Sequence, residues 1–314
     1  MFKSLIQRRQ FLSHSSVTAA GLLGALRLAA LEGGSPKELH LSSNEYSWTV
    51  FYKRENRDFK GTLESALPDL TRSSLNGLEP SIEKTEEIDR LGPLLKKNNL
   101  EMRSIYVNSS LHQPDRSDKS IGQILTIARK AKEWGTRIIV TNPSPIRWGG
   151  PENKDDTQLG VQASALNRLG EQLGSLGLKL AYHNHDIELR NAAREFHHMM
   201  LGTDPAVVSL CLDAHWVYRG AGNSQVALFD VVKLYGARII EIHLRQSKGN
   251  VWSETFAEGD INYAELAKQL LRIGVKPHLV LEVAVEEGTP KTMDPVEAHR
   301  RSSEYARKVF AGFA

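Results

Sequence analysis

The sequence predicts a single α/β domain of the (β/α)₈ or TIM-barrel class, and two observations carry this prediction. From Pro36 onward, short β-rich runs alternate with stretches in which apolar residues recur every three or four positions. Such alternation is typical of parallel strands joined by crossover helices. The length also fits, because barrels of this class commonly fill ~250 residues as one domain. We therefore expect one barrel over residues 36–314.

Eight segments fit the expected strands. The later ones are nearly continuous apolar runs, as is typical of parallel strands that are buried on both faces. Polar residues follow where these runs end, and in a barrel that end is the catalytic face. The expected strands are Leu39–Leu41, Leu75–Glu79, Glu101–Val107, Arg137–Thr141, Lys179–His183, Val208–Asp213, Ile239–Leu244 and His278–Val283.

Helices are expected between the strands. Ile121, Ile124 and Ala128 share one helical face. Gly135 and Gly274 stand shortly before the fourth and eighth strands, where glycine supplies the left-handed cap of a helix. The longest irregular segments, which we expect to be loops over the barrel mouth, are Asn108–Asp118 and Thr141–Thr157.

The composition indicates an ordinary globular enzyme or binding protein. Of 314 residues, 40% are hydrophobic and 25% are charged, which is enough apolar material for a core without disulfides. The net charge is only +3, and part of it lies in Lys3, Arg8 and Arg9, so a nucleic-acid-binding surface is not indicated. Cys211 is the one cysteine and lies in an apolar run, so we expect a buried side chain with no catalytic role.

The N-terminus resembles a twin-arginine export signal. Arg8-Arg9 and a short basic start precede the small-residue apolar stretch 17–26, and Arg27 closes it. That stretch is too short to span a bilayer permanently. Residues 1–30 are therefore expected to be a signal peptide that directs the protein to the periplasm. An amphipathic helix or a disordered tail is the alternative.

Metal-competent side chains follow four consecutive predicted strands. These are His183 or His185 after the fifth strand, Asp213 after the sixth, His243 after the seventh and Glu282 after the eighth. Adjacent strand ends of a closed barrel lie close together, so these side chains can converge. Nitrogen and carboxylate donors together suit Mn²⁺, Zn²⁺, Fe²⁺ or Co²⁺. Singly, each has an ordinary alternative, since a histidine can be buried in a core, Asp213 can cap a turn and Glu282 can pair with an arginine.

Several motifs around these positions are similar to one known family. They resemble the sugar phosphate isomerase/epimerase superfamily of xylose isomerase-like barrels, and the similarity covers most of the chain after about residue 38. It is strongest from Leu180 to Glu282. The motifs are Tyr182–Glu188, Leu212–Gly220, Ile242–Arg245, Glu258–Ile261 and Leu281–Val283.

The resemblance implies a divalent metal, Mn²⁺ first, with Zn²⁺, Co²⁺, Fe²⁺ or Mg²⁺ as alternatives. Asp213, His243 and Glu282 fall on the family's metal ligands. At the fifth strand the epimerases carry a glutamate where this chain has His183. The first ligand is therefore either His183 or Glu188 from the following loop.

The resemblance also implies the roles of further residues. His185 falls where related dehydratases place a catalytic base, and an imidazole titrates near working pH. Glu188 or Glu282 is the alternative base. Arg245 matches a substrate-contacting position. From their places after strand ends, we also expect Lys248 and Trp216 to contact substrate and Glu79 and Asn44 to reach the pocket. Surface solvation is the alternative for Lys248, and packing beneath the barrel rim is the alternative for Trp216.

The predicted function is that of a metal-dependent sugar isomerase or epimerase, which removes a proton beside a carbonyl and stabilises the enediolate through the metal. One alternative is an exported keto-sugar lyase or hydratase, similar to inosose dehydratase, that acts on 3-keto-glycosides. A non-catalytic carbohydrate-binding barrel is a second. A DNA-repair endonuclease of the same fold needs more ligands on the early strands than this sequence has. The expected partner is a small sugar or keto-sugar, with neither nucleic acid nor a membrane, and a homo-oligomer is compatible with the sequence.

Overall fold

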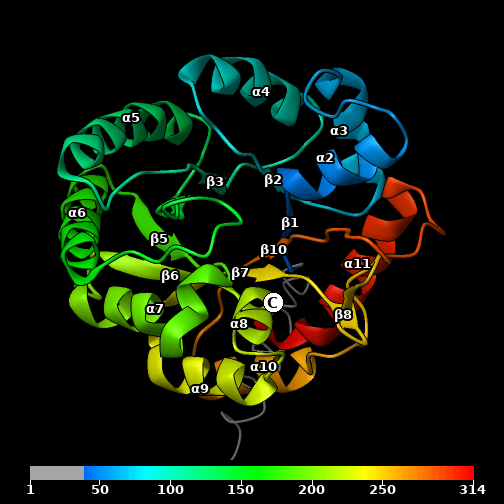
Figure 1. Ribbon diagram of the computed structural model, residues 1–314. Helices are drawn as coiled ribbons and strands as arrows, with labels where there is room; N and C mark the ends of the chain where they lie inside the picture. Colours follow the sequence, from blue (N-terminus) through cyan, green and yellow to red (C-terminus); the bar gives the residue numbers. More distant parts are fainter. Residues whose placement is uncertain (1–38) are drawn as a thin grey trace, which may run out of the picture. The chain divides into compact units, whose positions relative to one another are not determined.

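Eight parallel strands form a barrel whose outer surface is covered by helices, as the computed structural model shows for residues 39–314 (Figure 1). The predicted (β/α)₈ class is confirmed. Each predicted strand has a counterpart in the barrel. The barrel strands are β1 (Leu41–Asn44), β2 (Gly77–Glu79), β3 (Ser104–Tyr106), β4 (Ile138–Thr141), β5 (Lys179–His183), β6 (Val208–Asp213), β7 (Ile239–Leu244) and β10 (His278–Leu281).

Parallel pairing runs through the sheet in the order β2, β1, β10, β7, β6, β5, β4 and β3. Between β2 and β3 the barrel is closed by separate backbone hydrogen bonds. The amide of Leu78 donates to the carbonyl of Glu101 at 3.0 Å, and the amide of Tyr106 donates to that of Pro80 at 2.9 Å. The carboxyl ends of all eight strands therefore open on one face.

Helices follow the strands around the outside of the barrel. Gly135 and Gly274 have positive φ angles of 90° and 72°, which confirms the predicted glycine positions at helix ends. Asp155 and Gln158 form a capping box at the start of the helix Asp156–Ser175. The helices are α2 (Glu45–Arg54), α3 (Leu63–Arg72), α4 (Thr85–Lys97), α5 (Pro114–Lys132), α6 (Asp156–Ser175), α7 (Arg190–Gly202), α8 (Ala214–Gly220), α9 (Gln225–Tyr235), α10 (Tyr263–Arg272) and α11 (Pro295–Val309).

Several predicted strands are shorter in the structure, and two other boundaries were wrong. The first strand extends to Asn44 rather than ending at Leu41, because its polar residues are buried on the sheet and do not appear as an apolar run. The predicted loop 108–118 ends at Gln113, since Pro114 begins α5, and proline suits the first turn of a helix. A small antiparallel hairpin of β8 (Ser247–Lys248) and β9 (Val251–Trp252) after β7 was not predicted.

Apolar side chains form a large core and a small separate cluster. The large core includes residues from the strands and from the helices that cover them. The small cluster joins Ile138, Val140, Ala181 and Cys211, so the predicted burial of Cys211 is confirmed. Two buried polar side chains, those of Glu241 and His243, lie close to Cys211. His243 belongs to the candidate site described below, and Glu241 lies 3.5 Å from its Nε2.

The predicted signal peptide, residues 1–30, lies outside the described residues. Within residues 39–314, no helix combines the length and the apolar character needed to cross a membrane. Residues Leu39–Ala314 form one compact unit.

Trp48 packs α2, near the start of this unit, against α11, near its end. Its buried ring stacks on His299 of α11 with centroids 4.0 Å apart and contacts Phe59 at 6.1 Å. We expect Trp48→Ala to lower the free energy of unfolding by about 3–5 kcal/mol, because a large buried ring leaves a cavity. Urea denaturation measures this change. Leu201→Ala, at a side chain that is 75% exposed, is the control, and equal losses in both variants would contradict the assignment.

Candidate active site

Four buried side chains converge at the carboxyl ends of neighbouring strands. His183 ends β5, Asp213 ends β6, His243 lies in β7, and Glu282 follows β10. One potential ligand atom from each of the four lies within 4.8 Å of the others. The fold therefore brings together the four side chains that the sequence predicts as metal ligands. We call these four side chains the donor group.

The donor atoms nearly touch. His183 Nε2 lies 3.1 Å from His243 Nδ1 and 3.9 Å from Asp213 Oδ2. His243 Nδ1 lies 2.5 Å from Glu282 Oε2. Water reaches the four side chains little or not at all, so their charges act in a medium of low polarity.

Asp213 uses its two oxygens differently. Oδ1 accepts from the backbone N–H of Trp216 at 2.8 Å and caps α8. Oδ2 faces the other donors and has no hydrogen-bond partner among the described residues. The prediction that Asp213 could cap a turn is thus correct for Oδ1, while Oδ2 remains available to bind a metal. The side-chain amide of Asn184 bridges the backbone N–H and C=O of Asp213, both at 3.1 Å, which fixes its position.

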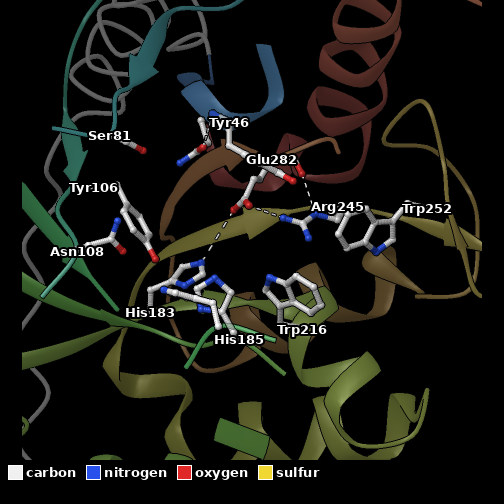
Figure 2. A pocket seen from close by; sticks show the side chains of 12 residues that line it. Tyr46, Ser81, Tyr106, Asn108, His183, His185, Trp216, Arg245, Trp252 and Glu282 are labelled. Carbon is white, nitrogen blue, oxygen red and sulfur yellow. Dashed lines mark hydrogen bonds and ion pairs between the residues drawn. The ribbon is translucent and has the colours of Figure 1, made fainter. Parts of the chain in front are cut away.

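Arg245 holds Glu282 in place. Its Nη2 pairs with Glu282 Oε1, and its Nε donates to the backbone carbonyl of Glu282 at 2.9 Å. The guanidinium lies over the rings of Trp216 and Trp252, 5.1 Å and 4.5 Å from their centroids. Figure 2 shows these side chains around the ion pair. Glu282 therefore belongs to the donor group and also pairs with an arginine.

Two further carboxyl groups lie beneath His243. Glu79 Oε1 is 2.9 Å from His243 Nε2, and Glu241 Oε1 is 3.5 Å from the same atom. Burial opposes ionisation of Glu79, but His243 outweighs it and lowers the pKa of Glu79 to about 2. Burial and the neighbouring Glu79 raise the pKa of Glu241 to about 8, so Glu241 is protonated at neutral pH. The ring of His243 thus lies between carboxylates.

The residues present fit a divalent cation. Two imidazole nitrogens and two carboxylate oxygens form a donor set that suits Mn²⁺, Zn²⁺, Fe²⁺ or Co²⁺. Asp213 Oδ2 is buried and has no hydrogen-bond partner among the described residues, and its nearest cationic group is Arg245 Nη2 at 3.8 Å. A cation closer to this oxygen would compensate the cost of its burial. Burial raises the pKa of Asp213 to about 6, although Arg245 opposes the shift. A cation between these donors would reverse that burial penalty.

The two candidates for the first ligand lie in different places. His183 is within the donor group. Glu188 is in a short turn after β5, fully buried, where it accepts from Asn142 Nδ2 at 3.0 Å and from the backbone N–H of His185 at 2.7 Å. Burial and the nearby Glu195 raise the pKa of Glu188 to about 7. The structure therefore gives Glu188 a role in shaping the loop that carries His185.

His185 lies beside the donor group, with its ring centroid 4.8 Å from that of His183. Its Nδ1 has no hydrogen-bond partner among the described residues. Burial lowers the pKa of His185 to about 4, so its imidazole is neutral at pH 7 and can accept a proton.

A cavity of about 390 Å³ opens above the donor group, a volume typical of small-molecule sites. Aromatic and polar side chains form its wall (Figure 2). The lining residues are Asn44, Tyr46, Ser81, Tyr106, Asn108, Trp148, His183, His185, Trp216, Arg245, Trp252 and Glu282.

Residues 72–309 match the model of the xylose isomerase-like TIM barrel family. This chain belongs to that family. The resemblance seen in the strand-end motifs is therefore confirmed at the level of the family.

Proteins similar to this chain include two inosose dehydratases. The one from Bacillus licheniformis is 29% identical over 150 residues, which cover 42% of this chain and 48%, or about half, of that relative. The one from Clostridium botulinum is 21% identical over 278 residues, covering 79% of this chain and 90% of the relative. A sugar phosphate isomerase/epimerase structure from Parabacteroides distasonis has a TM-score of 0.68 at 18% identity, covering 89% of this chain and 96% of that one, which shows the fold.

Of the four predicted substrate-contacting residues, two line the cavity and two do not. Arg245 and Trp216 line the cavity. Lys248 is exposed on the β8–β9 hairpin, and Glu79 is buried beneath His243, so neither is among the lining residues. The carboxylate of Glu79 is held away from the cavity by Asn44 Nδ2, at 2.6 Å, and by His243 Nε2, at 2.9 Å.

Half of the cavity wall was not predicted from sequence. These side chains end or follow the first three strands or lie in the β4–α6 loop and the β8–β9 hairpin, whereas the metal-competent motifs in the sequence follow the later strands. The rule that every strand end of a barrel faces the site would have found Tyr106. The unpredicted lining residues are Tyr46, Ser81, Tyr106, Asn108, Trp148 and Trp252.

Proposed function

We propose that this protein is an enzyme that removes a proton beside the carbonyl of a keto-sugar, with elimination as the outcome. The observation that carries the proposal is the position of His185. His185 lines a cavity directly beside two imidazoles and two carboxylates that fit a divalent cation, and its buried Nδ1 has no hydrogen-bond partner among the described residues. The reacting carbon is then next to a base, and the carbonyl oxygen is next to the donors.

His183, Asp213, His243 and Glu282 would hold the metal, as the sequence predicts. A divalent ion there supplies positive charge that stabilises the oxygen of an enolate. Arg245 holds Glu282 and keeps its carboxylate ionised. Trp216 and Trp252 exclude water from this ion pair, so its charges interact strongly.

In the proposed reaction, one proton moves from the substrate through His185 to the leaving group. His185 takes the proton from the carbon beside the carbonyl, and the C–H electrons form the enolate. When the carbonyl re-forms, a C–C double bond appears and the C–O bond on the next carbon breaks. The departing oxygen recovers the proton from the imidazolium of His185, so water or an alcohol leaves without any redox change.

Elimination is favoured over epimerisation because one free base is present. Epimerisation removes a proton from one face and returns it to the other, which takes two acid–base groups. Among the described residues that line the cavity and lie outside the donor group, His185 is the one whose side chain has a pKa below neutrality and can act as a base at pH 7. The carboxylate of Glu282 is already bound by Arg245 and His243. The inosose dehydratases that resemble this chain support elimination. The second candidate function is an isomerisation in which one base removes and returns the proton on the same face of the substrate.

Solvent exchange tests this proposal. In D₂O, the metal-loaded protein should incorporate deuterium beside the carbonyl of inososes or 3-keto-glycosides and form the unsaturated ketone, as NMR would show. His185→Gln should slow both processes by about 10²–10⁴-fold, because the base is lost, while the metal content is unchanged. His198→Gln, at an exposed histidine of α7, is the matched control. Normal exchange in His185→Gln, or none with any carbonyl sugar in the wild type, would contradict the proposal.

We expect Glu79 to determine which ring nitrogen of His243 is free to bind the metal. A carboxylate at Nε2 favours the tautomer with the proton on Nε2, which leaves the lone pair on Nδ1 facing the other donors. Glu79→Gln should therefore weaken metal binding by about 10–100-fold in a calorimetric titration. Glu241→Gln is the control, because Glu241 is already protonated at neutral pH. Equal affinity in the wild type and Glu79→Gln would refute this role.

Metal affinity is expected to fall with pH. Burial opposes the imidazolium of His243, but negative neighbours such as Glu79 raise the pKa of the ring well above its ordinary value, so binding displaces a proton from it. Asp213 has its pKa raised to about 6 and is protonated below that pH. The loss of affinity should therefore steepen as pH falls through about 6, as Mn²⁺ titrations at several pH values would show. A pH-independent affinity would contradict the assigned donors.

A further inference from the structure

Two exposed aromatic side chains stand at the cavity. Trp148, in the loop between β4 and α6, is 55% exposed, and Tyr46, at the start of α2, is 45% exposed. Both line the cavity. The other large apolar side chains that are exposed in the described part of the chain are not among its lining residues. Exposed apolar surface at a polar pocket is a common mark of a binding site.

The loop that carries Trp148 is held firmly in place. Lys154 is buried, pairs with Glu195 of α7 at 2.7 Å, and donates to the carbonyl of Pro143 at 3.0 Å. Arg190 donates to the carbonyl of Gly150 at 2.8 Å. The ring of Trp148 is therefore presented to solvent by an ordered loop, and a ligand that contacts it does not have to order the loop first.

The ring of Trp148 begins an aromatic wall that leads to the donor group. Its centroid lies 5.1 Å from that of His185, which lies 5.8 Å from Trp216, which lies 5.4 Å from Trp252. Ser81 and Asn108 line other parts of the cavity (Figure 2). One part of the wall is thus apolar and flat, and another carries hydrogen-bonding groups. This combination suits sugar rings, which have C–H faces and hydroxyl edges.

The position of His185 divides the cavity into an inner and an outer part. A carbon that gives its proton to His185 must lie near the donors, so the reacting ring occupies the inner part. A group attached to that ring on the solvent side would face the exposed rings of Trp148 and Tyr46, which both line the cavity. A free monosaccharide would leave this aromatic surface without a partner.

Resting on the proposed function, we propose that Trp148 and Tyr46 form an outer subsite for the ring that leaves, so that the substrate is a keto-glycoside. The C–O bond that breaks is then the glycosidic bond, and the product is a ring-bearing alcohol that carries the proton from His185. A phosphorylated sugar does not fit as well. Arg245 is the one cation that lines the cavity in residues 39–314, and it is already paired with Glu282.

Binding of unreactive glycosides to the metal-loaded full-length protein tests the subsite without turnover. The probes are phenyl β-glucoside, which has an aromatic ring to place on Trp148, and methyl β-glucoside, which has none. Calorimetry should show that the wild type prefers the phenyl glycoside and that Trp148→Ala lowers this preference by about tenfold. Trp148→Phe should retain most of it, because a flat ring remains. Leu234→Ala, at an exposed side chain of α9, is the control with no change.

Two results would overturn the subsite. One is equal affinity of the wild type for both glycosides. The other is an equal loss of affinity for both in Trp148→Ala, which would mean that Trp148 supports the loop and does not contact the leaving ring. If the preference follows the prediction while no carbonyl sugar exchanges deuterium, the subsite stands and the proposed reaction fails.

Discussion

The structure depends on an electrostatic constraint, which is the burial of carboxylates and imidazoles from four strand ends around one point. Burying an unpaired charge is costly, so each group needs a partner. Glu282 has Arg245, and His243 has Glu79, but Asp213 Oδ2 has no hydrogen-bond partner within the described chain. A cation among the donors completes the compensation, and we propose that this is how the protein works.

The barrel and a supporting layer produce this arrangement together. Parallel strands in a closed sheet bring their carboxyl ends to one face, so neighbouring strands deliver neighbouring ligands. The orientation of each ligand is set by other residues. Asn184 fixes the backbone of Asp213, and Arg245 fixes Glu282 while two tryptophans cover its guanidinium. Such partners usually determine metal affinity as much as the ligands do.

The sequence was sufficient to predict the fold and the donor group, because both follow from periodicity and from polar residues at strand ends. It was not sufficient for the supporting layer. Glu79 looked like a substrate contact, since the sequence does not show that its carboxylate points toward His243. Lys248 and Trp148 illustrate the same limit, because loop and hairpin geometry decides that the first faces solvent and the second lines the cavity. The first β-strand was misplaced because buried serines resemble a loop.

The claim that His183, Asp213, His243 and Glu282 hold one divalent ion is tested most directly by anomalous diffraction from crystals grown with Mn²⁺. The account predicts a single strong peak at about 2.0–2.3 Å from one atom of each of these four side chains. No peak among them, or a peak bound by other residues while these four keep their direct contacts, would contradict it.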